Sequence, residues 1–219
     1  MINKNDCVII EPAMPAQSAV IWLHGLGADG YDFANIAPEL NLPSTRFVFP
    51  HAPMRAVTVN GGMVMRAWYD IVGFDLKDRE DLNGVNASTL LVNALIAEQI
   101  ATGIPSTKII IAGFSQGGAI ALHAGLRYHL PLAGILGLST YLPLTDVIST
   151  EKHPVNQSIP ILMMHGTFDT VVPMPLAMVG REALIAQGHQ VAWQTYPMAH
   201  QVCIPQIADI SVWLQEKLQ

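Results

Sequence analysis

The sequence predicts an α/β fold in which a mostly parallel sheet carries helices on both of its faces. Short apolar runs alternate along the chain with segments of helical periodicity, the order expected when helices connect parallel strands. These runs lack the alternation of polar and apolar residues that marks a sheet with one face in water, so both faces are expected to be covered. Because no repeat or linker divides the chain, we expect a single domain over residues 1–219.

The predicted strands and helices of the first part of the chain can be placed from these runs. Residues 7–10 form a short first strand, and residues 18–24 form a continuous apolar strand. A helix over 31–41 and a strand over 46–49 follow, the helix because its apolar residues recur on one face.

Residues 50–83 then show no clean periodicity. An irregular segment of this length inside a compact domain is usually functional or mobile. We interpret its apolar members, such as Met65 and Trp68, as the lining of a groove for the apolar part of a substrate, with segment 54–82 setting the length that fits. The competing interpretation, that Met65 and Trp68 fill space in the core, has equal support.

The second part of the chain completes the alternation. A long helix over 84–102 ends before Gly103, a residue typical of helix C-termini. Tyr141, in the polar loop over 139–158, is a further candidate for substrate contact. The remaining predicted strands are 108–112, 132–138, 159–165 and 190–196, and the remaining helices are 118–128, 174–187 and 204–218.

The pentapeptide Gly113-Phe114-Ser115-Gln116-Gly117 lies between the strand 108–112 and the helix that follows it. Gly-x-Ser-x-Gly at a turn from strand to helix is the nucleophile elbow, in which a strained serine projects its hydroxyl above the sheet. Glycines avoid collisions in so tight a turn, and the helix N-terminus offers N–H groups to developing negative charge. This context favours a catalytic elbow over an ordinary Gly- and Ser-rich turn, so Ser115 is the predicted nucleophile.

Two backbone N–H groups are predicted to form an oxyanion hole. The stretch from Gly25 to Gly30 fits the dinucleotide-binding pattern Gly-x-Gly-x-x-Gly, but that pattern requires an acidic residue about 20 positions further on. The strand 46–49 ends instead in Pro-His. In hydrolases with a nucleophile elbow, an early His-Gly turn supplies one N–H and the residue after the serine supplies the other. We therefore assign these donors to Leu26 and Gln116.

Asp169 is the predicted acid of a catalytic triad. A serine nucleophile needs a base, the base needs an orienting group, and on this architecture the order along the chain is Ser, Asp or Glu, His. Asp169 follows the strand 159–165, at the carboxyl end where ligand-facing residues gather in open α/β sheets. A turn or helix-capping role is the alternative. Glu182, inside a helix, and Asp146, far from a strand end, are less well placed.

His200 is the predicted base. Only two histidines follow Asp169. His189 comes directly after Gly188, at a helix-to-strand turn on the opposite edge of the sheet, and is predicted to be a solvated turn residue. His200 follows the strand 190–196 and therefore lies on the same edge as Ser115 and Asp169.

Composition excludes several classes of function. Hydrophobic residues make up 51% and charged residues 13% of the 219 residues, which argues against disorder. The net charge of -6 offers no basic surface for nucleic acid or for anionic membranes. The histidines before Asp169 show no metal-ligand spacing and the two cysteines form no Cys-x-x-Cys pair, so no metal and no other cofactor is expected.

The same features predict a cytoplasmic protein. The first residues lack the apolar core of a signal peptide. No run approaches the roughly 18 apolar residues needed to span a bilayer, so stable membrane insertion is not expected. Cys7 and Cys203, without a disulfide framework, suit a reducing compartment.

Together these motifs are similar to those of a known family, the bacterial carboxylesterases and phospholipase-like esterases related to the acyl-protein thioesterases. They occur in the family's order over most of the chain. The resemblance rests on Leu23-His24-Gly25-Leu26-Gly27-Ala28-Asp29-Gly30, Pro50-His51-Ala52-Pro53, Trp68-Tyr69-Asp70, Gly113-Phe114-Ser115-Gln116-Gly117-Gly118, His165-Gly166-Thr167-Phe168-Asp169 and His200.

The resemblance implies an α/β-hydrolase fold without a large cap domain. It implies a cytoplasmic serine esterase, often a homodimer, with a triad at the positions of Ser115, Asp169 and His200 and an oxyanion hole at Leu26 and Gln116. After His-Gly-Leu-Gly the chain has Ala-Asp-Gly, the bacterial pattern, where eukaryotic thioesterases usually have Asp-Thr-Gly. This departure weakens the case for acylated proteins as the natural substrate.

The predicted function is hydrolysis of carboxylic esters with short to medium acyl chains through an acyl-enzyme on Ser115. Lysophospholipids and acyl thioesters are further candidate substrates. The alternative from another class is a hydrolase-fold protein that binds an acyl ligand without turnover, since fold does not fix function. A peptide substrate ranks low because no large appended domain is present to select peptides.

Overall fold

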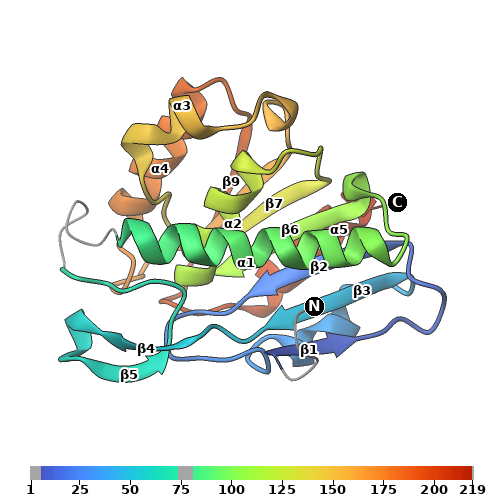
Figure 1. Ribbon diagram of the computed structural model, residues 1–219, viewed down its shortest axis with the longest axis horizontal. Helices are drawn as coiled ribbons and strands as arrows, with labels where there is room; N and C mark the ends of the chain where they lie inside the picture. Colours follow the sequence, from blue (N-terminus) through green and yellow to red (C-terminus); the bar gives the residue numbers. More distant parts are fainter. Residues whose placement is uncertain (1–5, 74–80, 219) are drawn as a thin grey trace.

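The structure is a computed structural model that describes residues 6–73 and 81–218. Its centre is a seven-stranded sheet in the order β1-β3-β2-β6-β7-β8-β9 (Figure 1). All neighbouring strands run parallel except β1, which pairs antiparallel with β3 at one edge. The strands are β1 (Cys7–Ile10), β2 (Ser18–Leu23), β3 (Thr45–Pro50), β6 (Ile109–Phe114), β7 (Gly134–Leu138), β8 (Ile161–Gly166) and β9 (Val191–Tyr196).

Helices cover both faces of this sheet, as the apolar strands predicted. In Figure 1, α1 lies on the near side of the sheet and α5 behind it. The first face packs against α1 (Leu82–Ala101), α2 (Gln116–Arg127) and α4 (Met174–Ala186), and the second against the 3-10 helix η2 (Ala34–Leu40) and α5 (Ile204–Leu218).

Strand β2 shows how a continuous apolar run is divided between two cores. Ile21 and Leu23 belong to the core beneath α1 and α2, whereas Val20 and Trp22 belong to the core beneath η2 and α5. All four side chains are at most 1% exposed. Because full burial of such a side chain stabilises a fold by about 1.5–3 kcal/mol, the strands are held firmly and their ends are fixed in space.

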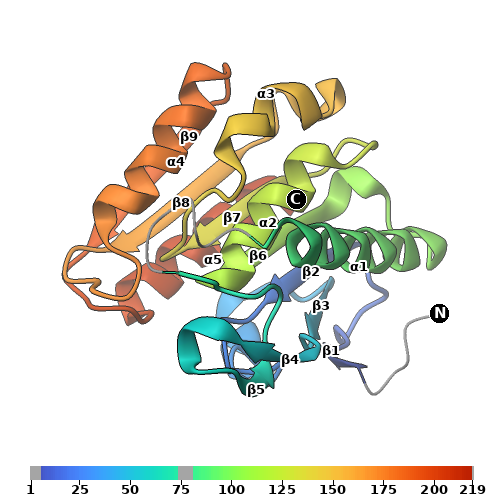
Figure 2. The same cartoon turned by 60° about the vertical axis from the view of Figure 1, so that its left-hand side comes forward.

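The irregular segment after β3 contains a separate hairpin. Strands β4 (Met54–Val57) and β5 (Met63–Arg66) pair antiparallel, and a 3-10 turn with Gly61 and Gly62 at positive φ joins them. Figure 2 shows this hairpin at one end of the molecule and α4 at the other. The strands were not predicted, and the rest of segment 54–82 lies partly outside the described residues.

Two smaller expectations were wrong. The predicted helix over 31–41 is a 3-10 helix with Pro38 inside it, which removes a backbone donor and prevents a regular α-helix. His189, expected in solvent, is only 4% exposed. Among the described residues, no helix combines the length and the apolar character needed to cross a membrane.

Candidate active site

Ser115 lies at the turn between β6 and α2 in a strained conformation. Its φ of 54° and ψ of -121° lie where a residue with a side chain is rarely found. The surroundings hold this backbone in place, because Ser115 N–H donates to the Leu138 carbonyl over 2.8 Å and the Thr140 hydroxyl donates to the Ser115 carbonyl over 2.7 Å. The strain is the feature that the elbow motif predicted.

The glycines of the elbow are required by close backbone contacts. A Cβ atom at Gly113 would lie 2.4 Å from the Gly117 backbone, and one at Gly117 would lie 2.4 Å from the Leu23 carbonyl oxygen. Both separations are far below any tolerated contact, so only glycine lets β6, α2 and the end of β2 approach one another.

Asp169 follows β8 and is buried, with a side chain 0% exposed. Its Oδ1 accepts hydrogen bonds from the N–H groups of Val171 and Val172, each over 2.9 Å. Its Oδ2 accepts a bond of 2.7 Å from His200 Nδ1. The Asp169 carboxylate therefore has both roles. It accepts from the backbone of the turn that follows, and it also accepts from His200.

His200 reaches Asp169 from the loop after β9. A Cβ atom at Gly166 would lie 2.4 Å from the Met198 carbonyl oxygen, so glycine at the end of β8 lets this loop pass. Because a carboxylate only accepts, Nδ1 of His200 carries the hydrogen, and in the neutral ring Nε2 is left with a lone pair. That is the tautomer a general base needs.

A second histidine also borders Asp169. His165, at 1% exposure, donates from Nε2 to the Val172 carbonyl over 2.8 Å, and the same nitrogen lies 3.5 Å from Asp169 Oδ2. Burial lowers the pKa of His165, so this ring remains neutral and holds the loop that carries the carboxylate.

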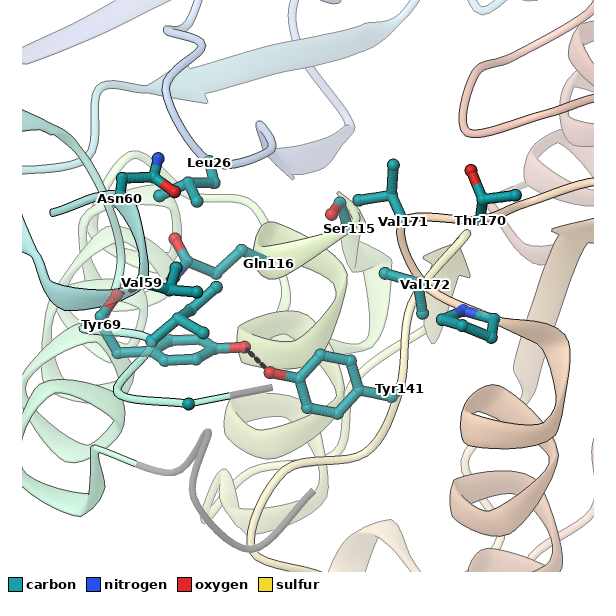
Figure 3. Close-up of a pocket in the computed structure, with 13 residues that line it drawn as sticks. Leu26, Val59, Asn60, Tyr69, Ser115, Gln116, Tyr141, Thr170, Val171 and Val172 are labelled. Carbon is teal, nitrogen blue, oxygen red and sulfur yellow. Dashed lines mark hydrogen bonds between the residues drawn. The ribbon is translucent and has the colours of Figure 1, made fainter. Parts of the chain in front are cut away.

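The turn that carries Leu26 comes from the end of β2. Leu26 and Gln116 line one cavity together with Ser115 (Figure 3). Gly27 adopts a positive φ of 78°, and its N–H donates to the Arg66 carbonyl over 2.9 Å, so the turn is attached to the end of β5. The structure thus brings both predicted oxyanion residues to the nucleophile.

This cavity measures about 420 Å³, within the range of small-molecule sites. Tyr141, the predicted substrate contact, lines it, and its hydroxyl forms a 2.6 Å hydrogen bond with that of Tyr69. Figure 3 shows this pair on the side of the cavity away from Leu26. The other lining side chains are largely apolar and include Val59, Ile71, Val171, Val172 and Pro173.

Met65 and Trp68 are not among the residues that line this cavity, and for Trp68 full burial corrects its interpretation as a groove residue. Trp68 is 0% exposed and belongs to the core beneath α1 and α2. The Met65 sulfur accepts a 3.4 Å hydrogen bond from Asn60 Nδ2, beside the Leu26 turn. The groove residues that sequence reasoning missed are neighbours of these positions, Tyr69 and Ile71, and the Val171-Val172-Pro173 run after Asp169.

Across the described residues, no cluster of three or more His, Cys, Asp or Glu side chains has the arrangement of a metal site.

Comparison with protein families identifies the architecture. The model of the family described as Phospholipase/Carboxylesterase matches residues 4–218. The chain belongs to this family. Membership makes it a serine hydrolase of the esterase and thioesterase class with an α/β-hydrolase fold, in which no large cap domain is evident.

Two curated relatives of this chain are named acyl-protein thioesterase 1 and come from fungi. Acyl-protein thioesterase 1 of Neurospora crassa is 38% identical over 96% of this chain and 91% of its own. Acyl-protein thioesterase 1 of Schizosaccharomyces pombe is 42% identical over 84% of this chain and 83% of its own. These matches do not support the bacterial grouping that the Ala-Asp-Gly pattern suggested.

Two solved structures are similar to this chain in fold. The crystal structure of Arabidopsis thaliana SOBER1 has a TM-score of 0.88 at 30% identity, covering 93% of this chain and 100% of that one. The crystal structure of Zea mays acyl-protein thioesterase 2 has a TM-score of 0.89 at 27% identity, covering 97% and 99%.

Proposed function

We propose that this chain hydrolyses esters and thioesters of apolar acyl groups through an acyl-enzyme on Ser115, with His200 as base and Asp169 as its orienting acid. The observation that carries the proposal is the arrangement around Ser115. A strained serine opens into an apolar cavity, and a histidine follows on the same sheet edge, with its Nδ1 hydrogen bonded to a buried carboxylate.

The reaction has two steps. His200 Nε2 takes the hydroxyl proton as Ser115 Oγ attacks the acyl carbon, and the N–H groups of Leu26 and Gln116 stabilise the oxyanion. The carbon–oxygen or carbon–sulfur bond to the leaving group then breaks, and His200 returns the proton to that group. Water repeats the cycle on the acyl-enzyme, which releases the acid and restores the Ser115 hydroxyl.

The two cavities at the site suggest where each half of the substrate lies. We place the acyl chain in the apolar cavity that Ser115 lines. We place the leaving group in a second cavity of about 280 Å³, which is lined by His200, Phe114 and Asp32. A leaving group there lies beside the residue that must protonate it.

The names of the fungal relatives suggest which leaving group the substrate carries. The fungal relatives are named acyl-protein thioesterases, and we propose an S-acylated protein as a substrate on that basis. Lysophospholipids and small esters remain alternatives. A cytoplasmic location is supported by the free thiols of Cys7 and Cys203, and assembly as a homodimer by the family resemblance. Light scattering on the purified protein tests the homodimer.

The decisive test is hydrolysis of p-nitrophenyl esters from acetate to palmitate, with matched oxygen and sulfur esters of one acyl group and an S-acylated peptide. Ser115→Ala is expected to lose activity on the order of a million-fold. Ser139→Ala is the matched control, because Ser139 also follows a strand with a positive φ of 45° but is 0% exposed.

Activity above a few per cent in Ser115→Ala would contradict the assignment of the nucleophile. An absence of turnover on every ester, together with an absence of fluorophosphonate labelling at Ser115, would favour a protein that binds acyl groups without hydrolysing them.

A further inference from the structure

The two predicted oxyanion donors come from segments that are distant in the sequence. The Leu26 N–H belongs to the turn after β2, and the Gln116 N–H belongs to the start of α2. Catalytic donors must be held within about 0.5 Å of the productive geometry to stabilise the transition state. Some structure must therefore fix the position of the Leu26 turn relative to Gln116.

Trp68 is hydrogen bonded to both segments. Its indole Nε1–H donates to the His24 carbonyl over 2.8 Å, at the base of the Leu26 turn. Its backbone N–H donates to Gln116 Oε1 over 2.8 Å, and Gln116 Nε2 donates in return to the Tyr69 carbonyl over 2.7 Å.

The His24 ring holds the same turn from the other side. Its Nδ1–H donates to the Gly25 carbonyl over 2.7 Å, and its Nε2 accepts from the Ala52 N–H over 3.0 Å. Both ring nitrogens thus have fixed roles in the neutral ring. Burial lowers the pKa of His24 to about 4, so the ring stays neutral near pH 7.

These contacts are removed from water. Trp68 is 0%, His24 1% and Gln116 2% exposed. Hydrogen bonds in such surroundings are stronger and more rigid than those at a surface, and an unpaired partner is costly. The Trp68 carbonyl is itself held by the Ser88 hydroxyl, which connects the contacts to the buried face of α1.

We infer that Trp68 is a positioning residue that fixes the spacing of the two oxyanion donors. It does so through its indole bond to His24 and its backbone bond to the Gln116 side chain. The inference rests on the proposed function, because it concerns the hole in which the Leu26 and Gln116 N–H groups act. It also assigns a role to a residue that the sequence suggested for the substrate groove.

Loss of the Trp68 contacts should weaken binding of the transition state and leave binding of the substrate unchanged. A displaced Leu26 turn weakens contacts with the oxyanion, which exists only transiently, and leaves the apolar cavity for the acyl chain intact. Loss of an interaction of this kind lowers kcat and leaves KM nearly unchanged.

The chain offers a matched pair of variants for the test. Trp68→Phe removes the indole N–H that donates to His24 and keeps an aromatic ring in place. Trp22→Phe makes the same change at another buried tryptophan, 1% exposed on the opposite face of the sheet, whose Nε1 has no hydrogen-bond partner within the described part of the chain.

We expect Trp68→Phe to lower kcat by roughly 10- to 100-fold with KM within about two-fold, since small displacements at an active site cost up to about 100-fold. Trp22→Phe should keep kcat within about two-fold, as its indole N–H donates to none of the described residues. Affinity for a trifluoromethyl ketone, which binds Ser115 as a tetrahedral oxyanion, should fall with kcat/KM in Trp68→Phe. A general loss of stability would not produce that parallel change.

A second variant keeps the test decisive if Trp68→Phe does not fold. Gln116→Met retains the backbone N–H of the hole but breaks both side-chain bonds to residues 68 and 69. It should also lower kcat more than it raises KM. Wild-type kcat in either folded variant would overturn the inference while Ser115-dependent turnover stands. Absence of turnover in the wild-type protein would instead overturn the proposed function.

Discussion

On one side of Ser115, Asp169 and His200 lie in loops that directly follow β8 and β9, and a hydrogen bond of 2.7 Å joins them. On the other side, the Leu26 turn follows β2 but is held by the His24 ring and the Trp68 indole, and the Gln116 side chain in turn accepts from the Trp68 backbone N–H. The triad side is thus positioned by strand ends of the sheet. The oxyanion side is positioned by buried side chains that belong to no strand of that sheet.

The two sides should therefore respond differently to mutation. Strand ends are fixed by the two hydrophobic cores, and His165 adds one contact to the loop after β8, so on the triad side the reacting groups themselves are expected to matter most. On the oxyanion side the proposed donors are backbone groups, and their geometry depends on buried side chains that take no part in the proposed chemical steps.

The largest effect is expected on the triad side, for Asp169→Asn. Asparagine can still accept at Oδ1 from Val171 and Val172, so the loop should keep its shape. It would present an N–H to His200 Nδ1 and so favour the wrong tautomer, which should lower kcat by about 10⁴-fold, as in other triads. Steady-state kinetics with a p-nitrophenyl ester, together with urea unfolding, measure both quantities.

A variant that loses stability in proportion to its activity would show that Asp169 acts by capping its loop. A near-normal rate would place the catalytic acid elsewhere.

The positions of residues on the triad side could be predicted from the sequence because each residue directly follows a predicted strand. Asp169 and His200 each follow an apolar run, and parallel strands bring their carboxyl ends to one edge. The elbow was predicted in the same way, since the glycines around Ser115 carry a steric requirement that the sequence displays directly.

On the oxyanion side, the sequence predicted that Leu26 and Gln116 lie beside Ser115, but not the contacts that hold them there. The bonds of Trp68 to His24 and to Gln116 join residues separated by 44 and 48 positions, and no periodicity predicts them. A tryptophan in an irregular segment is equally compatible with a groove and with a core. The hairpin β4–β5 that precedes Trp68 was missed for another reason. Its exposed Met54, Met63 and Val64 break the alternation of polar and apolar residues that is expected of strands.

The pH dependence of the free energy of unfolding, compared with kcat, should distinguish a buried histidine that only stabilises the fold from one that also positions the site. Burial lowers the pKa of His24 to about 4. It lowers the pKa of His123, on α2 and in contact with Thr89 of α1, to about 3, against about 6.5 for both residues in an unfolded chain. The unfolded state therefore binds more protons below pH 6.5. The stability that each neutral ring contributes is fully present above that pH and is lost as the pH falls towards the folded value.

Each of the two histidines should then account for a loss of about 2 kcal/mol in the free energy of unfolding between pH 7 and pH 5. His24→Gln and His123→Gln should both flatten this dependence in urea titrations. Only His24→Gln should also lower kcat, because only His24 contacts the Leu26 turn. Equal kcat in both variants would contradict the importance of side-chain contacts on the oxyanion side.

The smallest effect is expected for Thr140→Val, which removes a side-chain contact from the triad side. The Thr140 hydroxyl donates to the Ser115 carbonyl over 2.7 Å, but the Ala119 N–H donates to the same oxygen over 3.1 Å, so that oxygen stays paired in the variant. Valine has nearly the shape of threonine, so we expect a loss of about 1 kcal/mol in the free energy of unfolding and a kcat within about three-fold of wild type. Paired urea titrations and steady-state kinetics measure the two. A fall in kcat as large as that expected for Trp68→Phe would mean that side-chain contacts also position the triad side, and the contrast between the two sides would disappear.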